Sequence, residues 1–226
     1  MQFSLDVGGG HPQLPRMDTY LPAVAPVAEI SPKRRQVLAA AEQLFLAQGY
    51  GAVSMDQVAR TANVSKATLY AYFPSKDALF ATIVGEGGLE RPLTEDLFPE
   101  EVTDLRAALH AIGLRTLLFM LRERTLSIYR IALAESARFP ELGMAFYANG
   151  PRLMHDRFVR WLETLAAAGM INAPNLRVAT EQFMAMVRAG VFLRRSLSIP
   201  PDASEAEIVS TVQAAVETWL KAYAAG

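Results

Sequence analysis

The stretch SMDQVARTANVSKATLYAYF, residues 54–73, constrains the fold more than any other part of the sequence. Ser54, followed three residues later by Gln57, predicts a capping box at the start of a short helix. Asn63 follows that helix and can adopt the left-handed conformation that ends helices. Ser65 is a favoured N-cap for a second short helix. Two short helices around a tight turn predict a helix-turn-helix, which places its second helix in the major groove of DNA.

The second helix of this motif is predicted to have one buried and one exposed face. Leu69 and Phe73 lie four residues apart and predict the buried face, and Pro74 stops the helix. The opposite face carries Lys66, Ala67, Tyr70 and Ala71. We therefore expect this helix to be presented outward.

Charge is distributed unevenly along the chain. The net charge is −1, which argues against non-specific coating of nucleic acid, but Ser31–Phe80 carries an excess of three positive charges. A mildly basic segment on an acidic body suits local contact with phosphate. Lys33, Arg34 and Arg35 fall in the first turn of a helix predicted from Ser31 to Gln48, where the helix dipole favours acids. Either DNA phosphate compensates them or they are ordinary solvated charges.

The segments RRQVLAAAEQLFLAQGYGAVSMDQVA and NVSKATLYAYFPSKDALF resemble the DNA-binding domain of the TetR/AcrR family of transcriptional repressors. The resemblance covers about Ser31 to Arg91. It implies an all-α protein with a three-helix head, residues 31–91, followed by a regulatory and dimerisation domain, residues 92–226. It also implies a bacterial, cytoplasmic regulator that binds double-stranded operator DNA and needs no cofactor.

The same resemblance implies which side chains contact DNA. The start of the second head helix and the recognition helix would lie in or near the groove, while Tyr70, Tyr72 and Lys76 would hold the backbone. The predicted DNA contacts are Lys33, Arg34, Arg35, Ser54, Met55, Ser65, Lys66, Ala67, Thr68, Tyr70, Tyr72 and Lys76. The helix predicted from Ser75 to Gly85 would link this head to the body.

The rest of the chain has no strand-like alternation and predicts a helical bundle behind a flexible tail at residues 1–30. The expected helices are Val102–Leu121, Arg124–Arg138, Glu141–Ala168 with an interruption near Gly150–Pro151, Leu176–Leu197, and Ser204–Ala224. RFPELGMAFYANGP and EQFMAMVRAGVFLRR are similar to the AefR-like subtype of C-terminal domain in the same family.

This half is rich in aromatic residues and methionine, which line adaptable apolar pockets but also fill ordinary cores. A small apolar inducer would bind between these helices. The candidate ligand-binding residues are Phe119, Tyr129, Phe146, Tyr147, Met154, His155, Phe158, Phe183 and Met186.

The last two predicted helices carry apolar stripes that either pack inside one subunit or form a dimer interface. In the resembled family, the last two helices of each subunit build a four-helix interface, so a homodimer is implied. The candidate interface residues are Val187, Gly190, Val212, Val216 and Trp219, with Trp219 as the expected anchor.

Other classes of protein compete with this interpretation. An all-helical enzyme, or an interaction or small-molecule-binding protein without specific DNA binding, stays open, although the Gly-x-Ser-x-Gly, Walker and His-Glu-x-x-His motifs are absent. With no cysteine, neither a disulfide nor a thiolate metal site can form, and no metal is expected. The most apolar run, Ala107–Leu121, is broken by His110 and Arg115, so no membrane span is predicted.

Overall fold

The computed structural model describes residues 31–85 and 97–225, and over these ranges the chain forms α-helices and no strand. The helices are α1 Pro32–Gln48, α2 Met55–Thr61, α3 Lys66–Tyr72, α4 Lys76–Gly85, α5 Leu105–Met120, α6 Glu123–Glu135, α7 Pro140–Asn149, α8 Pro151–Ala167, α9 Leu176–Arg188, α10 Val191–Ser196 and α11 Glu205–Tyr223. The predicted all-α fold class is confirmed. The predicted tail and the predicted boundary at residue 91 lie outside the described residues.

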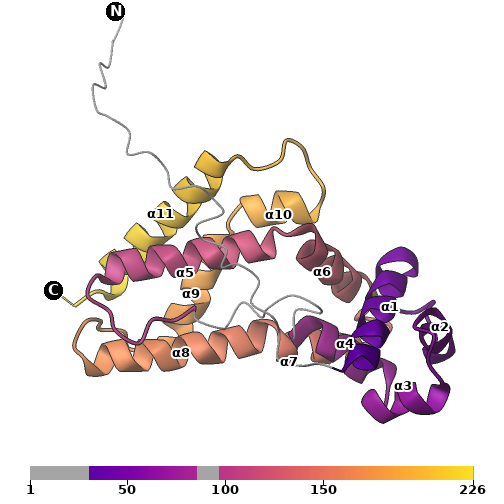
Figure 1. The fold of residues 1–226 in the computed structure, drawn as a ribbon. Coiled ribbons are helices and arrows are strands. Elements are labelled where there is room, and N and C mark those ends of the chain that lie inside the picture. The colour runs from indigo at the N-terminus through magenta and orange to yellow at the C-terminus, as the bar shows by residue number, and fades with distance from the viewer. Residues whose placement is uncertain (1–30, 86–96, 226) are drawn as a thin grey trace, which may run out of the picture.

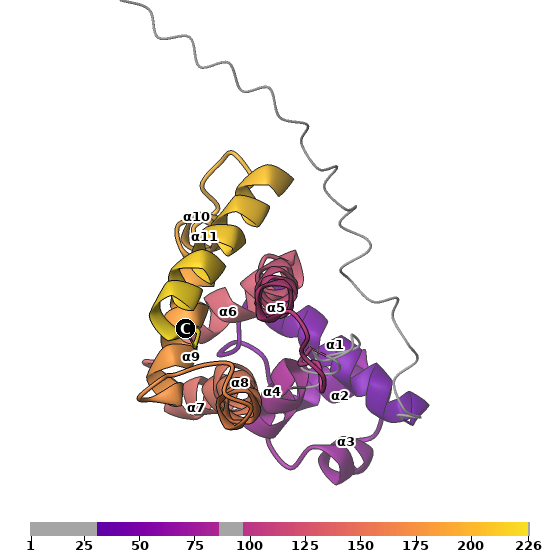
Figure 2. The ribbon, with the colours of Figure 1, turned by 90° about the vertical axis from the view of Figure 1, so that its left-hand side faces the viewer.

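The helices form a small head and a larger body (Figure 1). Helices α1, α2 and α3 make the head at one end, and α4 leads from it toward the body. Within the body, α9 packs against α5 and α8, and α11 lies on α5 and α9 (Figures 1 and 2). The body is therefore a bundle in which α9 is a central element.

Local signals fix the head helices where the sequence predicted them. Ser31 caps α1 by accepting a hydrogen bond from the Arg34 amide, 3.2 Å away, and Pro32 occupies the first turn. The buried side of α1 includes Leu38 and Phe45. Phe45 packs against the rings of Tyr50 and Phe80, with centroid separations of 5.4 and 5.9 Å. These aromatic contacts join α1 to α4.

Two breaks shape the body, and the sequence predicted only one of them. Gly150 ends α7, and Pro151 opens α8, as expected. The predicted single helix Leu176–Leu197 is wrong, because Ala189 takes an extended ψ of 164° and separates α9 from α10. Ala189 has high helix propensity, but Gly190 follows it with a φ of 13° and caps α10, so a glycine marks the break.

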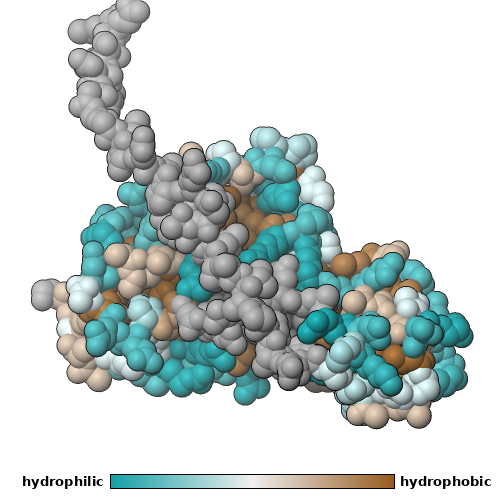
Figure 3. All heavy atoms as spheres, in the orientation of Figure 1, coloured by the Kyte–Doolittle hydropathy of each residue, from teal (hydrophilic) through white to brown (hydrophobic). Residues whose placement is uncertain are grey.

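Two hydrophobic cores hold the chain together. The larger core lies among α5, α8, α9 and α11. The smaller core fills the head but also takes in Ile128 of α6 and Leu142 of α7, both buried. The face seen in Figure 3 is accordingly covered largely by hydrophilic residues, with hydrophobic residues showing between them in smaller patches. Helices α6 and α7 of the body are therefore packed into the core of the head.

Candidate DNA interface and ligand cavity

Hydrogen bonds at the N-termini of α2 and α3 set the helix-turn-helix geometry. The Ser54 hydroxyl accepts from the Gln57 amide at 3.2 Å, and the Gln57 side-chain oxygen accepts from the Ser54 amide at 2.9 Å, which completes the predicted capping box. Asn63 has a φ of +51°, in the left-handed region as predicted. The Ser65 hydroxyl accepts from the Thr68 amide at 3.0 Å and so starts α3. The turn between the two helices is thus fixed by local chemistry.

Helix α3 separates a buried face from an exposed face. Leu69 and Phe73 are buried in the head core, while Lys66, Ala67 and Tyr70 are exposed, with Tyr70 exposed to 48%. A single exposed tyrosine is ordinary on a protein surface, and here it shows that this face of α3 is accessible. This face can therefore enter a groove without any change in the head.

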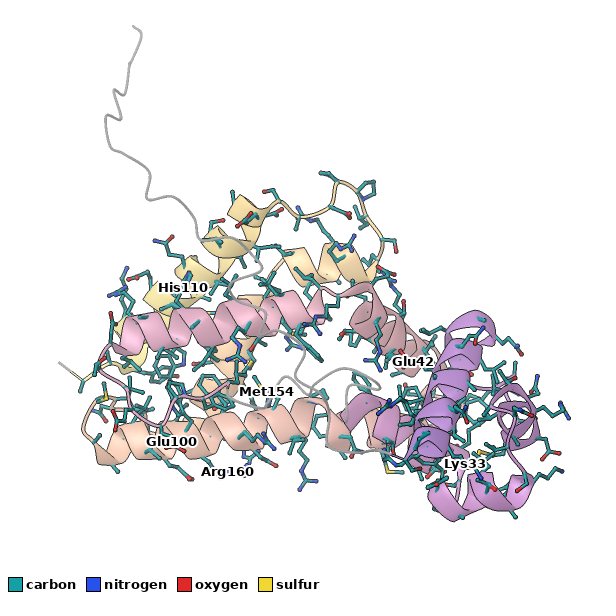
Figure 4. The ribbon with its side chains drawn as sticks, viewed as in Figure 1. Lys33, Glu42, Glu100, His110, Met154 and Arg160 are labelled. Carbon is teal, nitrogen blue, oxygen red and sulfur yellow. The ribbon has the colours of Figure 1, made fainter. Side chains whose placement is uncertain are left out.

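The start of α1 lies beside the end of α3, which brings basic residues to the same side. The Tyr72 hydroxyl and the Ser31 hydroxyl are 2.8 Å apart and share a hydrogen bond. Figure 4 shows Lys33 at this end of α1. Lys33 and Arg35 are exposed, and the Arg34 guanidinium lies over the Phe73 ring, 5.4 Å from its centroid.

Two other predicted DNA contacts are partly held within the head. Met55 is half-buried and packs against the head core. Lys66 pairs with Asp56 at 2.6 Å, but both side chains are well exposed, so phosphate can replace the carboxylate. The hydroxyl groups of Ser54 and Ser65 are already used as N-caps, and the Thr68 hydroxyl shares a hydrogen bond with that of Ser65, 2.8 Å away.

Lys76 differs from the other predicted contacts because the structure gives it a role inside the head. Its ammonium donates to the Tyr50 carbonyl at 2.8 Å and to the Val53 carbonyl at 3.0 Å, and it lies 4.2 Å from the centroid of the Tyr50 ring. Burial lowers the pKa of Lys76, while Glu135 and Glu141 act to raise it. Lys76 therefore anchors the turn between α1 and α2, and phosphate contact would use only its remaining donor.

A cavity of about 170 Å³ lies where the head meets the body. Its walls come from α4, α5, α6, α7, α8, α9 and α10. The lining residues are Ile83, Val84, Gly85, Thr116, Phe119, Met120, Arg124, Thr125, Ile128, Tyr129, Phe146, Asn149, Gly150, Pro151, Leu153, Met154, His155, Met184, Arg188 and Phe192. The predicted interruption at Gly150–Pro151 thus forms part of the wall.

Five of the predicted ligand-binding residues line this cavity: Phe119, Tyr129, Phe146, Met154 and His155. Figure 4 shows Met154 on the side of α8 that faces the interior of the body. The other four do not line it, and these predictions are wrong for this cavity.

The reasons differ for these four residues. Phe158 and Phe183 are fully buried and pack edge-to-face with centroids 5.2 Å apart, so they belong to the core of the body. Met186 is half-buried against the same core. Tyr147 is 57% exposed on the outer side of α7.

Polar groups are few in the cavity, and two have unusual surroundings. The Thr116 hydroxyl is buried without a hydrogen-bond partner. Burial lowers the pKa of His155, with Arg188 and Arg177 adding to the shift and Glu181 and Asp156 opposing it. His155 is therefore neutral at pH 7 and can both donate and accept a hydrogen bond. A ligand with one or two polar atoms on an apolar frame matches such walls.

Sequence reasoning missed most of the lining residues, among them Thr116, Met120 and Arg124. Thr116 and Met120 are one turn apart on α5, on a face shared with Phe119, but a single sequence does not show that this face meets a cavity rather than a helix. Arg124 gave no signal, because its surroundings come from α1 and α4. These residues become recognisable only when the helices are assembled.

The predicted dimer-interface residues are mostly core residues of one subunit. Val187, Val212 and Trp219 are fully buried, and Val216 nearly so. The Trp219 indole donates to the Ala179 carbonyl at 2.9 Å within the same chain. The prediction of Trp219 as an interface anchor is wrong, since both stripes turn toward α5 and toward each other.

Gly190 remains exposed, between α9 and α10. The opposite, outward faces of α9 and α11 are also exposed and carry small residues, among them Ala185 on α9 and Ala214 on α11. Figure 2 shows these two helices together on one side of the body.

Residues 31–85 and 97–225 contain neither a metal cluster nor a membrane span. No group of three or more histidine, aspartate or glutamate side chains that could hold a metal ion occurs within these ranges. No helix in the same described residues combines the length and the apolar character that a bilayer span requires.

A capped helix-turn-helix with an exposed recognition face, joined to a helical body that encloses an apolar cavity, defines a ligand-responsive DNA-binding transcriptional regulator. Comparison with known proteins agrees. Residues 37–83 match the family model for bacterial regulatory proteins of the tetR family. Residues 107–225 match the model for the C-terminal domain of AefR-like transcriptional repressors. The chain belongs to the TetR family of bacterial regulators.

Individual relatives extend the match over nearly the whole chain. The solved structure of the flavonoid-responsive regulator FrrA is 36% identical with a TM-score of 0.71, over 85% of this chain and 97% of that one. A TetR-family regulator from Mesorhizobium loti is 25% identical with a TM-score of 0.70, over 85% and 96%.

Curated relatives show the same pattern at lower identity. The regulator BetI of Rhizobium meliloti is 27% identical over 82% of this chain and 89% of its own length. YvkB of Bacillus subtilis, an uncharacterised helix-turn-helix regulator, is 28% identical over 73% and 83%.

Proposed function

We propose that this chain is a homodimeric repressor of bacterial transcription, acting in the cytoplasm by binding rather than by catalysis. It leaves a palindromic operator when a small, mostly apolar molecule fills the cavity. The observation that carries this proposal is that Ile83, Val84 and Gly85, at the end of α4, form part of the cavity wall. The first residue of α4, Lys76, anchors the turn before the recognition motif. One helix therefore contacts both the ligand and the DNA-binding head.

The expected DNA interface is the outward side of α3 with the starts of α1 and α2. Lys66 and Ala67 reach base edges and phosphate, Tyr70 and Tyr72 hold the backbone, and Lys33 and Arg35 add charge near phosphate. Their exposure on one side of the head supports this assignment.

The ligand is expected to be a flat aromatic molecule. Aromatic rings and methionine side chains make up much of the wall, and FrrA, whose name describes a flavonoid-responsive regulator, is 36% identical over most of the chain. An engineered cavity of about 150 Å³ holds one benzene molecule, so a cavity of about 170 Å³ must widen to admit a flavonoid. Widening moves its walls, and α4 is one of them.

Dimerisation is expected through the outward faces of α9 and α11. Small exposed residues such as Ala185 and Ala214 permit close approach of a second copy. A twofold dimer would place its two α3 helices at half-sites about 34–36 Å apart, or a multiple of this spacing.

The energy needed for release is modest. A ligand shifts the protein between two states only through its difference in affinity for them. A ten- to hundredfold loss of operator affinity corresponds to about 1.4–2.7 kcal/mol. By reciprocity, operator DNA weakens ligand binding by the same factor.

A direct test measures operator and ligand binding together. DNA from upstream of the chain's own gene is titrated in fluorescence anisotropy, with and without flavonoids and other aromatic compounds that raise the melting temperature. We expect specific binding that stabilising compounds weaken. Absence of specific DNA retention would refute the regulator, and stabilising compounds that leave operator affinity unchanged would refute the induction.

Two methionine variants test whether the ligand binds in the cavity. Met154→Trp fills the space that Met154 borders and should abolish compound binding in calorimetry. Met144→Trp adds the same ring at an exposed position of α7 outside the cavity, so it should bind the compound as the wild type does. Equal binding by both variants would place the ligand elsewhere.

A further inference from the structure

Arg124, near the start of α6, ties three helices together at the edge of the cavity. Its Nε and Nη2 atoms donate to the two carboxylate oxygens of Glu42 on α1, the second bond at 3.1 Å. Nη2 also lies 3.3 Å from the Ile83 carbonyl on α4. Figure 4 shows Glu42 on the side of α1 that faces α6. One guanidinium thus joins the body to both α1 and α4.

This ion pair is shielded from water. The side chains of Arg124 and Glu42 are exposed to only 18% and 14%. A shielded, two-bonded pair is strongly oriented, and loss of one partner leaves the other uncompensated. A ligand group that replaces Glu42 would compensate Arg124, and the Glu42 carboxylate would then have to turn toward water, because an unpaired shielded charge is costly.

Arg124 also lines the cavity, as does Arg188, and the described part of the wall contains no aspartate or glutamate. His155 is neutral because burial lowers its pKa. Glu42 compensates Arg124 from behind the wall, so the wall favours an anionic or strongly accepting oxygen over a cationic group where that oxygen can take the place of Glu42. The electrostatics therefore restrict the ligand class more than the apolar walls do.

We propose that the ligand carries an acidic oxygen, a carboxylate or phenolate, that binds Arg124 and competes with Glu42 for the guanidinium. Binding then breaks the hydrogen bonds by which Arg124 links the start of α6 to α1 and α4. The proposal rests on the ligand-responsive function above and names both the chemical class of the ligand and the contact that transmits its binding.

The far end of α6 explains why this exchange moves the head. Glu135 accepts hydrogen bonds from the amides of Tyr50 and Gly51, each at 2.6 Å. Helix α6 thus holds the head at both of its ends. Release of Arg124 leaves the Glu135 contact and the buried Ile128 side chain as links between α6 and the head, and the head turns about them.

The test uses a matched pair of probes, 2-naphthoate and 2-naphthamide, which share a ring system and differ in charge. Isothermal calorimetry on the DNA-free protein measures both. We expect the wild type to bind naphthoate at least about tenfold more tightly than naphthamide, because hydrogen bonds to a charged oxygen are stronger than neutral ones. Equal affinities would overturn the proposal.

Variants separate competition from simple structural support. Glu42→Gln removes the competing charge, so it should bind naphthoate at least about fivefold more tightly than the wild type does, at the low end of the 5- to 150-fold range of typical coupling. Its affinity for naphthamide should not change. Arg124→Met should remove the preference for naphthoate. If Glu42→Gln weakens or does not alter naphthoate binding, Glu42 does not compete and the proposal is wrong.

Two controls protect these measurements. The first control is Arg130→Met, on the same helix. Arg130 donates to the Arg195 and Ser196 carbonyls and does not line the cavity, so this variant should keep the wild-type preference for naphthoate. If Arg124→Met fails to fold because Glu42 is left unpaired, the double variant Glu42→Gln/Arg124→Met removes both charges and should show no preference. Retention of the preference in the double variant would overturn the proposal.

A DNA measurement distinguishes this proposal from the function on which it rests. If the wild type prefers naphthoate over naphthamide as expected, but naphthoate never alters operator affinity, the proposed ligand chemistry stands and induction fails. If other compounds release the operator while the naphthoate preference is absent, induction stands and the Arg124 exchange fails.

Discussion

The head and the body use aromatic side chains in opposite ways. In the head, Phe45 and Phe80 fill the core, while Tyr70 and Tyr72 stand in solvent on α3. In the body, few aromatic side chains stand in solvent, and the buried ones divide between a close-packed cluster and the cavity wall. A recognition surface is set by the exposed face of one helix, whereas a cavity is set by the space that several helices leave.

The difference has a consequence for mutagenesis. A change on the exposed face of α3 alters binding and leaves folding unaffected. A change in the body alters folding if the side chain is packed, and ligand binding if it lines the cavity. The following changes test this division.

Trp219→Ala should have the largest effect. The indole is fully buried, donates to the Ala179 carbonyl at 2.9 Å and packs against Phe183. Truncating a buried tryptophan costs about 3–5 kcal/mol, so we expect the free energy of unfolding to fall by this amount in urea titration.

The control for this variant is Tyr147→Ala, at an exposed position on α7, which should change the free energy of unfolding by less than about 0.5 kcal/mol. A folded, fully stable Trp219→Ala protein that has become monomeric would return Trp219 to the dimer interface.

Glu135→Gln should lower the stability of the protein and weaken operator binding, because Glu135 links the body to the head. The carboxylate accepts from the Tyr50 and Gly51 amides, and an amide side chain would turn an N–H group toward one of these donors. Hydrogen bonds to charged groups are worth about 1.5–3 kcal/mol each, so we expect a loss of about 2–3 kcal/mol in stability, with weaker operator binding.

Glu123→Gln is the matched control, on the same helix but with a side chain 67% exposed, and it should leave stability nearly unchanged. Equal losses in the two variants would show that Glu135 does not hold the head.

Lys76→Met separates structural support from phosphate contact. Loss of the bonds to the Tyr50 and Val53 carbonyls should cost about 1.5 kcal/mol, at the low end for charged hydrogen bonds because Lys76 is half-buried. The salt dependence of operator binding should keep its wild-type slope. Lys66→Met, at an exposed position of α3, should reduce that slope by about 0.9. The same reduction in Lys76→Met would establish a phosphate contact there.

Tyr70→Phe should have the smallest effect. The hydroxyl is exposed on α3, so thermal stability should not change. Loss of one hydrogen bond to the DNA backbone should weaken binding by about two- to tenfold, the range expected for 0.5–1.5 kcal/mol. The weakening should be equal for operator and unrelated DNA, because phosphate contacts carry no sequence information. Unchanged anisotropy titrations for both DNAs would remove Tyr70 from the interface.

The sequence predicted the head closely because its signals are local. The Ser54–Gln57 capping box, the left-handed Asn63 and the Ser65 cap all involve residues within three positions of one another. Lys76 lies outside this set, since its partners Tyr50 and Val53 are more than twenty residues away.

The body was predicted less well because burial there is decided between helices. Phe146 and Phe158 look alike in sequence, yet one lines the cavity and the other fills the core. The apolar residues of α11, Trp219 among them, have a spacing that fits a dimer interface as well as a core. Only the position of α5, which packs against α11, shows that they belong to the core. The break at Ala189 carries no proline, and its local signal, Gly190, also fits a close contact between helices.

The shared core of the head with α6 and α7 has a consequence for protein engineering. A truncated chain that ends near residue 91 would uncover the surface that Ile128 and Leu142 bury and would lose the Glu135 contacts to the turn after α1. Anyone who transplants this DNA-binding specificity onto another sensor has to carry the chain through α7. The unit that can be transferred is therefore defined by its packing. It ends at α7, well inside the predicted regulatory domain of residues 92–226.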